Sequence, residues 1–235
     1  MFEFSAKGII WDLDGTLLNA IKIHDDVLSE IFQRRNIAVP SPEIFAANHH
    51  EHLRETIRSL TGLGGKELES IYEEFIRAED HHYARPGSLY YPDGINLLQC
   101  CHDAGLRQVI ISNRSHFSDD RLGSPRNLAE KPPLRGLIDA TVCGDDNEFR
   151  KPDPRILDSI EHKLGLMHSP LIVIGDQFVD AALAQNIGGQ AILVQRNEEG
   201  IPHLDRLSEQ WLRKYLTIVR SLDAVSIHLS ETTPV

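Results

Sequence analysis

The sequence predicts an α/β fold: a doubly wound, Rossmann-like parallel sheet with a small all-helical domain inserted near its start. Three observations support this class. Short apolar runs of strand length alternate with helical patterns along most of the 235-residue chain. Several of these runs end directly in charged or hydroxyl residues, as strands do at the ligand-binding edge of such a sheet. Between residues 19 and 87 the strand patterns disappear and helical periodicity takes over.

The first strand is predicted over residues 9–11, and it ends in two carboxylates, Asp12 and Asp14, followed by Gly15. Side chains two positions apart on an extended backbone point to the same side, so these carboxylates would lie close together. Like charges at short range raise one pKa or require a cation. A simple Asp-Gly turn is the alternative interpretation. A calcium loop is excluded, because no third ligand precedes the glycine.

The helical insertion is predicted over residues 19–87, which leaves residues 1–18 and 88–235 as a discontinuous α/β core. Its helices are expected at residues 23–35, 51–60 and 66–82, with a turn at residues 40–42. Because the insertion follows the first carboxylate pair directly, we expect it to lie over that end of the sheet. A helical domain without any gating role is the alternative.

The later elements complete the predicted alternation of strands and helices. We expect strands at residues 108–111, 137–144, 171–174 and 191–195. We expect helices at residues 92–105 and 180–188, and a third that begins at Pro154 with Asp153 as its N-cap. The rest of the prediction is a polar loop at residues 117–133, a helical segment at 197–223 and an edge strand at 224–229.

Polar groups also follow the three strands after the first. They are Ser112 and Asn113 after the second strand, Lys151 downstream of the third, and Asp176 with Asp180 after the fourth. Together with Asp12-Leu13-Asp14-Gly15-Thr16, they resemble in order the four signature motifs of the haloacid dehalogenase (HAD) superfamily of phosphohydrolases. Those motifs are Asp-x-Asp-Gly-Thr, a Ser or Thr, a Lys, and Gly-Asp-x-x-x-Asp. Taken singly, each could be turn polarity, a solvated lysine or a helix-start acid, but all four in order favour an enzyme.

The resemblance implies which groups react and which hold a metal. Asp12 would be the nucleophile that forms an aspartyl phosphate, and Asp14 would act first as general acid and then as general base. Mg²⁺ would be held by the Asp12 and Asp176 side chains and the Asp14 carbonyl, with Asp180 supporting the coordination. The acid at Asp14 disfavours dehalogenase activity, because the dehalogenases of the superfamily lack it.

The resemblance also implies which groups bind the substrate. The phosphoryl oxygens would be held by the Ser112 hydroxyl, the Lys151 ammonium, and the backbone amides of Leu13 and Asn113. The helical insertion corresponds to the small C1-type cap of the family. His49 and His50 lie where that cap often places its substrate-specificity loop, so both are candidates for substrate contact. The alternative is that these histidines are ordinary surface residues.

Composition narrows the possible partners. The formal net charge of −11 argues against nonspecific binding to nucleic acid or to an anionic membrane. No apolar stretch approaches the length of a membrane span, and the first residues lack a signal-peptide pattern. The cysteines Cys100, Cys101 and Cys143 lack a metal-site spacing and are expected to be buried thiols in a reducing compartment. These features favour a cytoplasmic protein. We expect it to be a monomer or a dimer.

The predicted function is the Mg²⁺-dependent hydrolysis of small phosphorylated metabolites. The resemblance is to the branch that includes phosphoglycolate phosphatase and beta-phosphoglucomutase. A phosphosugar mutase that uses the same aspartyl phosphate is one alternative. The other is a phosphate-binding regulatory protein without turnover, against which the complete pair of acids and Lys151 argue.

Overall fold

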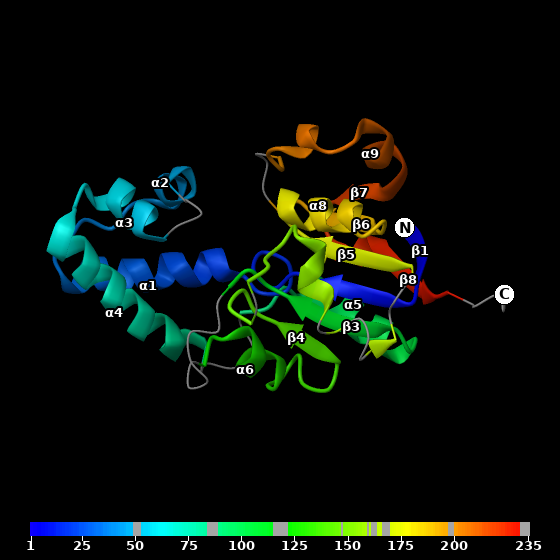
Figure 1. Ribbon diagram of the computed structural model, residues 1–235. Coiled ribbons are helices and arrows are strands. Elements are labelled where there is room, and N and C mark those ends of the chain that lie inside the picture. The colour runs from blue at the N-terminus through cyan, green and yellow to red at the C-terminus, as the bar shows by residue number, and fades with distance from the viewer. Residues whose placement is uncertain are drawn as a thin grey trace. The chain divides into compact units, whose positions relative to one another are not determined.

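The chain forms two compact units in a computed structural model (Figure 1). The structure describes residues 1–48, 53–83, 89–114, 122–146, 148–158, 160, 164–165, 170–196 and 200–230. One unit comprises Met1–Asn19 and Tyr90–Val235, and the other comprises Ala20–Leu89. None of the helices in the described part of the chain combines the length and the apolar character that a membrane span requires.

The larger unit is built on a six-stranded sheet in which every pair of neighbouring strands is parallel. In spatial order its strands are β4 (Ala140–Val142), β3 (Arg107–Ile111), β2 (Gly8–Trp11), β5 (Leu171–Gly175), β6 (Gln190–Val194) and β7 (Leu216–Val219). The chain proceeds from β2 toward one edge and from β5 toward the other. The topological switch point therefore lies between β2 and β5, and the predicted doubly wound sheet is confirmed.

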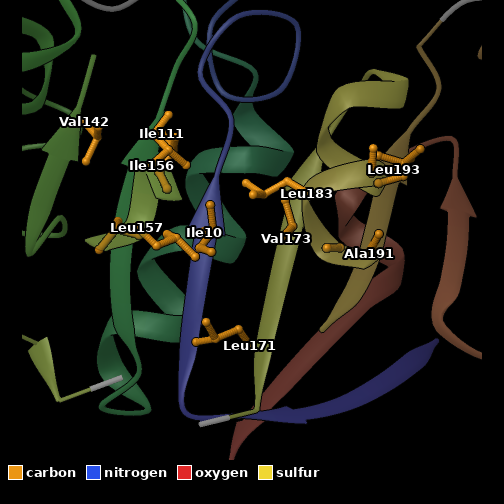
Figure 2. Close-up of a cluster of buried hydrophobic side chains, with 14 of the residues drawn as sticks. Ile10, Ile111, Val142, Ile156, Leu157, Leu171, Val173, Leu183, Ala191 and Leu193 are labelled. Atoms are coloured by element: carbon orange, nitrogen blue, oxygen red, sulfur yellow. The ribbon is translucent and has the colours of Figure 1, made fainter. Parts of the chain in front are cut away.

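Apolar side chains cover both faces of this sheet, as expected when helices flank a parallel sheet. One face carries a cluster to which neighbouring strands contribute Ile10, Ile111, Val142, Val173 and Leu193 (Figure 2). Leu157 of the 3₁₀ helix η1 (Pro154–Leu157) and Leu183 of α8 (Phe178–Asn186) pack against it. The central strands are thus fully buried, which fixes the position of the residues that follow them.

The other face contains a buried polar group whose hydrogen bonds are satisfied. The Trp11 indole Nε1 donates to Gln108 Oε1 at 3.0 Å. The Gln108 amide in turn donates to the carbonyl of Leu98, in α5 (Pro92–Asp103), at 2.9 Å. A buried amide with these partners avoids the cost of desolvation and joins the central strand to a flanking helix.

The C-terminal segment differs from the prediction. Residues 197–223 were expected to be helical, but in the described part, residues 200–223, only η2 (Leu204–Arg206), α9 (Glu209–Tyr215) and η3 (Leu222–Ala224) are. Leu216–Val219 forms strand β7 and pairs with β6. The run Thr217-Ile218-Val219 is β-branched throughout and favours a strand. The edge strand expected at residues 224–229 is β8 (Val225–Leu229), but it pairs with β1 (Phe2–Ala6) in a separate two-stranded sheet that the sequence analysis missed.

Smaller corrections concern loops. Residues 117–133 were expected to be a loop, but Pro125–Ala129 forms the short helix α6, capped by the Ser124 side chain. Strand β4 is shorter than predicted. The Asp153 cap is confirmed, because its side chain accepts from the Arg155 backbone N at 3.0 Å. Cys101 and Cys143 are buried as expected, whereas Cys100 is exposed.

The smaller unit is helical, with α1 (Ala20–Arg34), α2 (Pro42–Ala47), α3 (Leu53–Thr61) and α4 (Gly65–Tyr83). Three of these helices were predicted within a few residues. Helix α2 was not, because Pro42 was assigned to a turn although proline is also favoured at the first helical position. Helix α1 contacts α4, and Glu74 of α4 forms ion pairs with Arg34 and Arg35. His49 and His50 lie outside the described residues.

Candidate active site

Asp12 lies immediately after β2 at the switch point of the sheet. Its backbone N donates to the carbonyl of Ile174, in the neighbouring strand β5, at 2.8 Å. The chain then turns sharply, with Gly15 at a φ of +84° and the Leu18 N donating to the Leu13 carbonyl at 2.8 Å. Glycine adopts this positive φ without the steric cost that a side chain adds. The turn keeps the Asp12 side chain at the carboxyl edge of the sheet.

A buried lysine pairs with this carboxylate. The Lys151 Nζ donates to Asp12 Oδ1 at 2.5 Å and to Asp180 Oδ1 at 2.7 Å, and its side chain is only 3% exposed. Asn113 fixes the backbone of this lysine, because its side chain accepts from the Lys151 N at 2.9 Å and donates to the Lys151 carbonyl at 3.2 Å. The loops after β3 and β4 are thus joined at the residue that carries the buried cation.

Three carboxylates gather around this position. Asp12, Asp176 and Asp180 each offer an oxygen, and these oxygens lie within 4.8 Å of one another. Asp176 Oδ1 is buried and has no hydrogen-bond partner among the described residues. Both oxygens of Asp180 are engaged, one by Lys151 and the other by the Gln177 backbone N at 3.1 Å. Hard oxygen ligands and an unpaired buried carboxylate oxygen fit a divalent cation such as Mg²⁺.

Burial makes Asp12 and Asp176 difficult to ionise without a cation. Burial raises the pKa of Asp12 from 3.8 to about 7, an effect that Lys151 opposes and that Asp180 and Asp14 reinforce. Burial, and then the charge of Asp12, raises the pKa of Asp176 well above its ordinary value. Burial alone would lower the pKa of Lys151, but Asp12 and Asp180 outweigh it and raise that pKa. Three ionised carboxylates and one ammonium leave two negative charges, which a divalent cation would balance.

These pKa shifts predict how the stability of the metal-free protein depends on pH. Because the pKa of Asp12 is higher in the folded than in the unfolded chain, the folded protein binds the extra proton between its ordinary pKa of 3.8 and about 7. The contribution of Asp12 to the free energy of unfolding therefore falls as the pH rises through this window. We expect urea unfolding in EDTA to show this fall relative to an Asp12→Asn variant. A difference that grows in favour of the wild type with rising pH would contradict the prediction.

The predicted acid Asp14 is held by an arginine that the sequence analysis missed. Arg114 donates from Nε to Asp14 Oδ2 at 2.9 Å and from Nη2 to Asp14 Oδ1 at 2.5 Å. Its backbone N also donates to Ser112 Oγ at 3.1 Å. The available sequence signal was its position, two residues beyond the predicted phosphate-binding serine at the end of β3.

A second missed residue, Arg196, holds the turn that follows Asp12. Its guanidinium donates to the carbonyls of Gly15 at 3.0 Å and Thr16 at 2.9 Å. It also donates to both carboxylate oxygens of Asp93 and stacks on the Tyr91 ring at 3.5 Å. A planar guanidinium with carboxylate and aromatic partners has little rotational freedom, so it holds the turn after Asp12 rigidly against Asp93. Arg196 comes two positions after the end of β6, and that location was its only sequence signal.

Gly15 also leaves room for the Asp176 carboxylate. A Cβ at this position would overlap that carboxylate, so a side chain would force Asp176 to turn away. We expect Gly15→Ala to lower the affinity for a divalent cation and to reduce turnover by roughly 10-fold or more, because the displaced carboxylate no longer converges with the others. Thermal unfolding with and without Mg²⁺, together with steady-state kinetics, measures both effects.

Gly136→Ala is the matched control for Gly15→Ala. Gly136 has a φ of +81°, but a Cβ there would meet nothing within 4 Å. It therefore reports the backbone strain alone, about 1 kcal/mol. If both variants respond to added divalent cation as the wild type does, the close approach of Gly15 to Asp176 has no functional importance.

The structure thus brings together most of the predicted site residues. Asp12, Asp176, Asp180 and Lys151 form one buried cluster, and Asn113 and Ser112 lie in the adjoining loop. Leu13 follows Asp12 directly, with its side chain buried. Asp14 faces Arg114 instead of Lys151.

Comparisons with known proteins agree with this arrangement. The family model described as haloacid dehalogenase-like hydrolase matches residues 9–194. A phosphoglycolate phosphatase from Agrobacterium fabrum is 31% identical over 208 residues, which cover 83% of this chain and 83% of that protein. The chain belongs to the haloacid dehalogenase-like hydrolases. The resemblance to the HAD superfamily that the four sequence motifs indicated is therefore confirmed.

Solved structures share the fold of this HAD-like hydrolase at low sequence identity. A predicted phosphoglycolate phosphatase from Haemophilus somnus 129PT matches with a TM-score of 0.68 and 16% identity, over 95% of this chain and 96% of that one. A proposed beta-phosphoglucomutase from Thermotoga maritima matches with a TM-score of 0.68 and 14% identity, over 92% and 95%. These similarities show the fold. The family match and the phosphatase relatives indicate a phosphatase enzyme, as predicted.

Proposed function

We propose that this HAD-like hydrolase is a Mg²⁺-dependent phosphatase of small phosphorylated metabolites that works through an aspartyl phosphate on Asp12. The observation that carries the proposal is the hydrogen bond of 2.5 Å between Lys151 and Asp12, inside a three-carboxylate cluster at the switch point of the sheet. Ligands bind at such switch points, and phosphoryl transfer requires positioned cations beside a nucleophile. The first substrate to test is phosphoglycolate, because the phosphatase relatives carry that name.

The metal would be held by the side chains of Asp12 and Asp176 together with the Asp14 carbonyl. The unpaired Asp176 Oδ1 supports this assignment. Asp180 would orient Lys151 and the ligands, since both of its oxygens already have protein partners. When bound, Mg²⁺ would neutralise charge that develops on the phosphoryl oxygens.

The chain's own groups would perform the remaining steps. An Asp12 oxygen forms a bond to phosphorus while the bond from phosphorus to the leaving oxygen breaks, and Asp14 gives that oxygen a proton. Asp14 then takes a proton from the water that attacks the aspartyl phosphate, which releases inorganic phosphate and restores Asp12. Lys151 and the Ser112 hydroxyl would hold nonreacting phosphoryl oxygens throughout.

A panel of phosphate monoesters tests this proposal. We expect Mg²⁺-dependent release of inorganic phosphate from phosphoglycolate and from some other small esters. EDTA should remove the activity, and added Mg²⁺ should restore it. Interconversion of sugar monophosphates that depends on priming by a bisphosphate, without net phosphate release, would indicate a mutase instead. If wild type and Asp12→Asn both release a negligible amount of phosphate from every ester, the proposal fails in favour of a phosphate-binding regulatory protein.

A further inference from the structure

Arg114 engages the whole carboxylate of Asp14. Its Nε and Nη2 donate to the two different oxygens of that carboxylate, and its Nη1 donates to the Gly123 carbonyl at 3.1 Å. A parallel pair of charge-assisted hydrogen bonds of this kind is among the strongest and most directional polar contacts in proteins. The loop after β3 therefore carries a guanidinium group whose geometry matches a planar carboxylate, and Asp14 supplies that carboxylate.

This pair lies at the more open end of the site. The side chains of Lys151 and Asp12 are 3% and 9% exposed, whereas those of Arg114 and Asp14 are 16% and 30% exposed. A phosphoryl group that reaches Asp12 must occupy the buried end. The leaving group of the same ester must then extend toward the open end, past Asp14.

The ion pair with Arg114 also occupies the carboxylate oxygens that Asp14 would use on a substrate. Both Asp14 oxygens accept from Arg114, so a leaving-group oxygen that approaches Asp14 meets a carboxylate already filled by a strong donor. The ion pair therefore has to open, at least on one side, before Asp14 can act on a substrate. A guanidinium that leaves one carboxylate in a partly buried site needs another anion, because an unpaired buried charge is costly.

We propose that Arg114 is a second anion site, which binds a carboxylate on the leaving group of the substrate and, in doing so, releases Asp14. This proposal rests on the proposed phosphatase function and deepens it. It identifies Arg114 as the residue that would select, among small phosphate monoesters, those that carry a carboxylate close to the ester oxygen. The exchange replaces one carboxylate by another on the guanidinium fork, so Arg114 has an anionic partner before and after it.

The test compares two esters of the same length. Phosphoglycolate carries the carboxylate, whereas ethyl phosphate has a methyl group in its place. We expect the wild type to favour phosphoglycolate in kcat/KM. Arg114→Gln should raise KM for phosphoglycolate by roughly 10- to 100-fold, as expected for the loss of hydrogen bonds to a charged group. The kcat/KM for ethyl phosphate should not fall, because this ester has no carboxylate to lose and Asp14 no longer has to leave Arg114. The preference for phosphoglycolate should therefore disappear.

Two further variants test whether an effect of Arg114→Gln comes from lost substrate binding or from a change in folding. Arg114→Lys keeps the charge but lacks the planar fork, and it should recover only part of the preference. Arg107→Gln removes an arginine at the start of β3, one that pairs with Asp139 at 2.8 Å, and it should leave the preference unchanged. Thermal unfolding of each variant establishes that the protein compared is folded.

The outcomes are distinguishable. If Arg114→Gln lowers kcat/KM equally for both esters, Arg114 only positions Asp14 or its loop, and the second anion site is wrong. The site is also wrong if the wild type hydrolyses ethyl phosphate as well as phosphoglycolate, although the phosphatase function then stands. If the folded wild type hydrolyses neither ester nor any other member of the panel, the phosphatase function fails, and this inference fails with it.

Discussion

Asp12→Asn is expected to lower kcat for phosphate release by a factor on the order of 10⁴ or more, as removal of a nucleophile does in other enzymes. The amide is nearly the same size as the carboxylate, and its oxygen can still accept from Lys151, so the site keeps its shape. The amide cannot capture phosphorus to form the aspartyl phosphate. Steady-state release of inorganic phosphate, with a single-turnover search for the phosphorylated protein, measures the effect.

The same substitution should leave the metal-free protein at least as stable as the wild type at pH 8. Burial raises the pKa of Asp12 to about 7, so its ionised form is unfavourable in the fold at that pH, and a neutral amide removes this cost. Asp26→Asn is the matched control, since Asp26 forms an exposed i,i+4 pair with Lys22. It should retain wild-type turnover. Substantial turnover by Asp12→Asn would remove Asp12 from the role of nucleophile.

Lys151→Met is expected to impair both catalysis and folding. Without the ammonium, Asp12 and Asp180 lose their shared cation inside a buried site, which by analogy with broken buried ion pairs costs roughly 3–5 kcal/mol in free energy of unfolding. The loss in stability should be largest near pH 8 and smaller at acid pH, where the raised pKa of Asp12 and of Asp176 allows protonation. Urea unfolding in EDTA at both pH values measures it.

Added Mg²⁺ should distinguish the role of Lys151 in stability from its role in catalysis. A bound divalent cation neutralises carboxylates, so it should restore part of the lost stability of Lys151→Met. It should not restore turnover, because no ammonium then holds the phosphoryl oxygen. Lys22→Met, at an exposed lysine, should change the free energy of unfolding by no more than about 1 kcal/mol. If Lys151→Met unfolds as the wild type does, Lys151 does not balance the carboxylate cluster.

Much of the site followed from the sequence because parallel strands end at a common edge. Asp12 and Asp176 directly follow β2 and β5, which are neighbours in space although far apart along the chain. The rule that ligands bind beyond strand ends predicted that the two residues meet. Lys151 was predicted only through the family resemblance, since a single lysine before a helix is usually solvated. The Asn113 hydrogen bonds that hold its backbone are revealed by no pattern in the sequence.

Arg114 and Arg196 could not be predicted from the sequence, and the physical reason is the same for both. Arg114 and Arg196 act through their guanidinium groups, several bonds from the backbone, on residues about 100 and 180 positions away. Periodicity and capping rules describe neighbours along the chain and do not specify such partners. Strand β7 was missed because α9 precedes it without a turn residue between them, so one helical pattern seemed to continue. Contact of His49 or His50 with a substrate stays a prediction.

The pairing of β1 with β8 has a consequence for synthesis on the ribosome. Phe2 pairs with Val225, 223 positions later, and β1 pairs with no other strand among the described residues. Only Lys7 separates β1 from β2, which leads to Asp12. Strand β1 thus leaves the exit tunnel long before β8 and waits, with an open edge, until β8 emerges. Such long-range closure is slow, and a chain stalled before β8 would present that edge to chaperones or to other nascent chains.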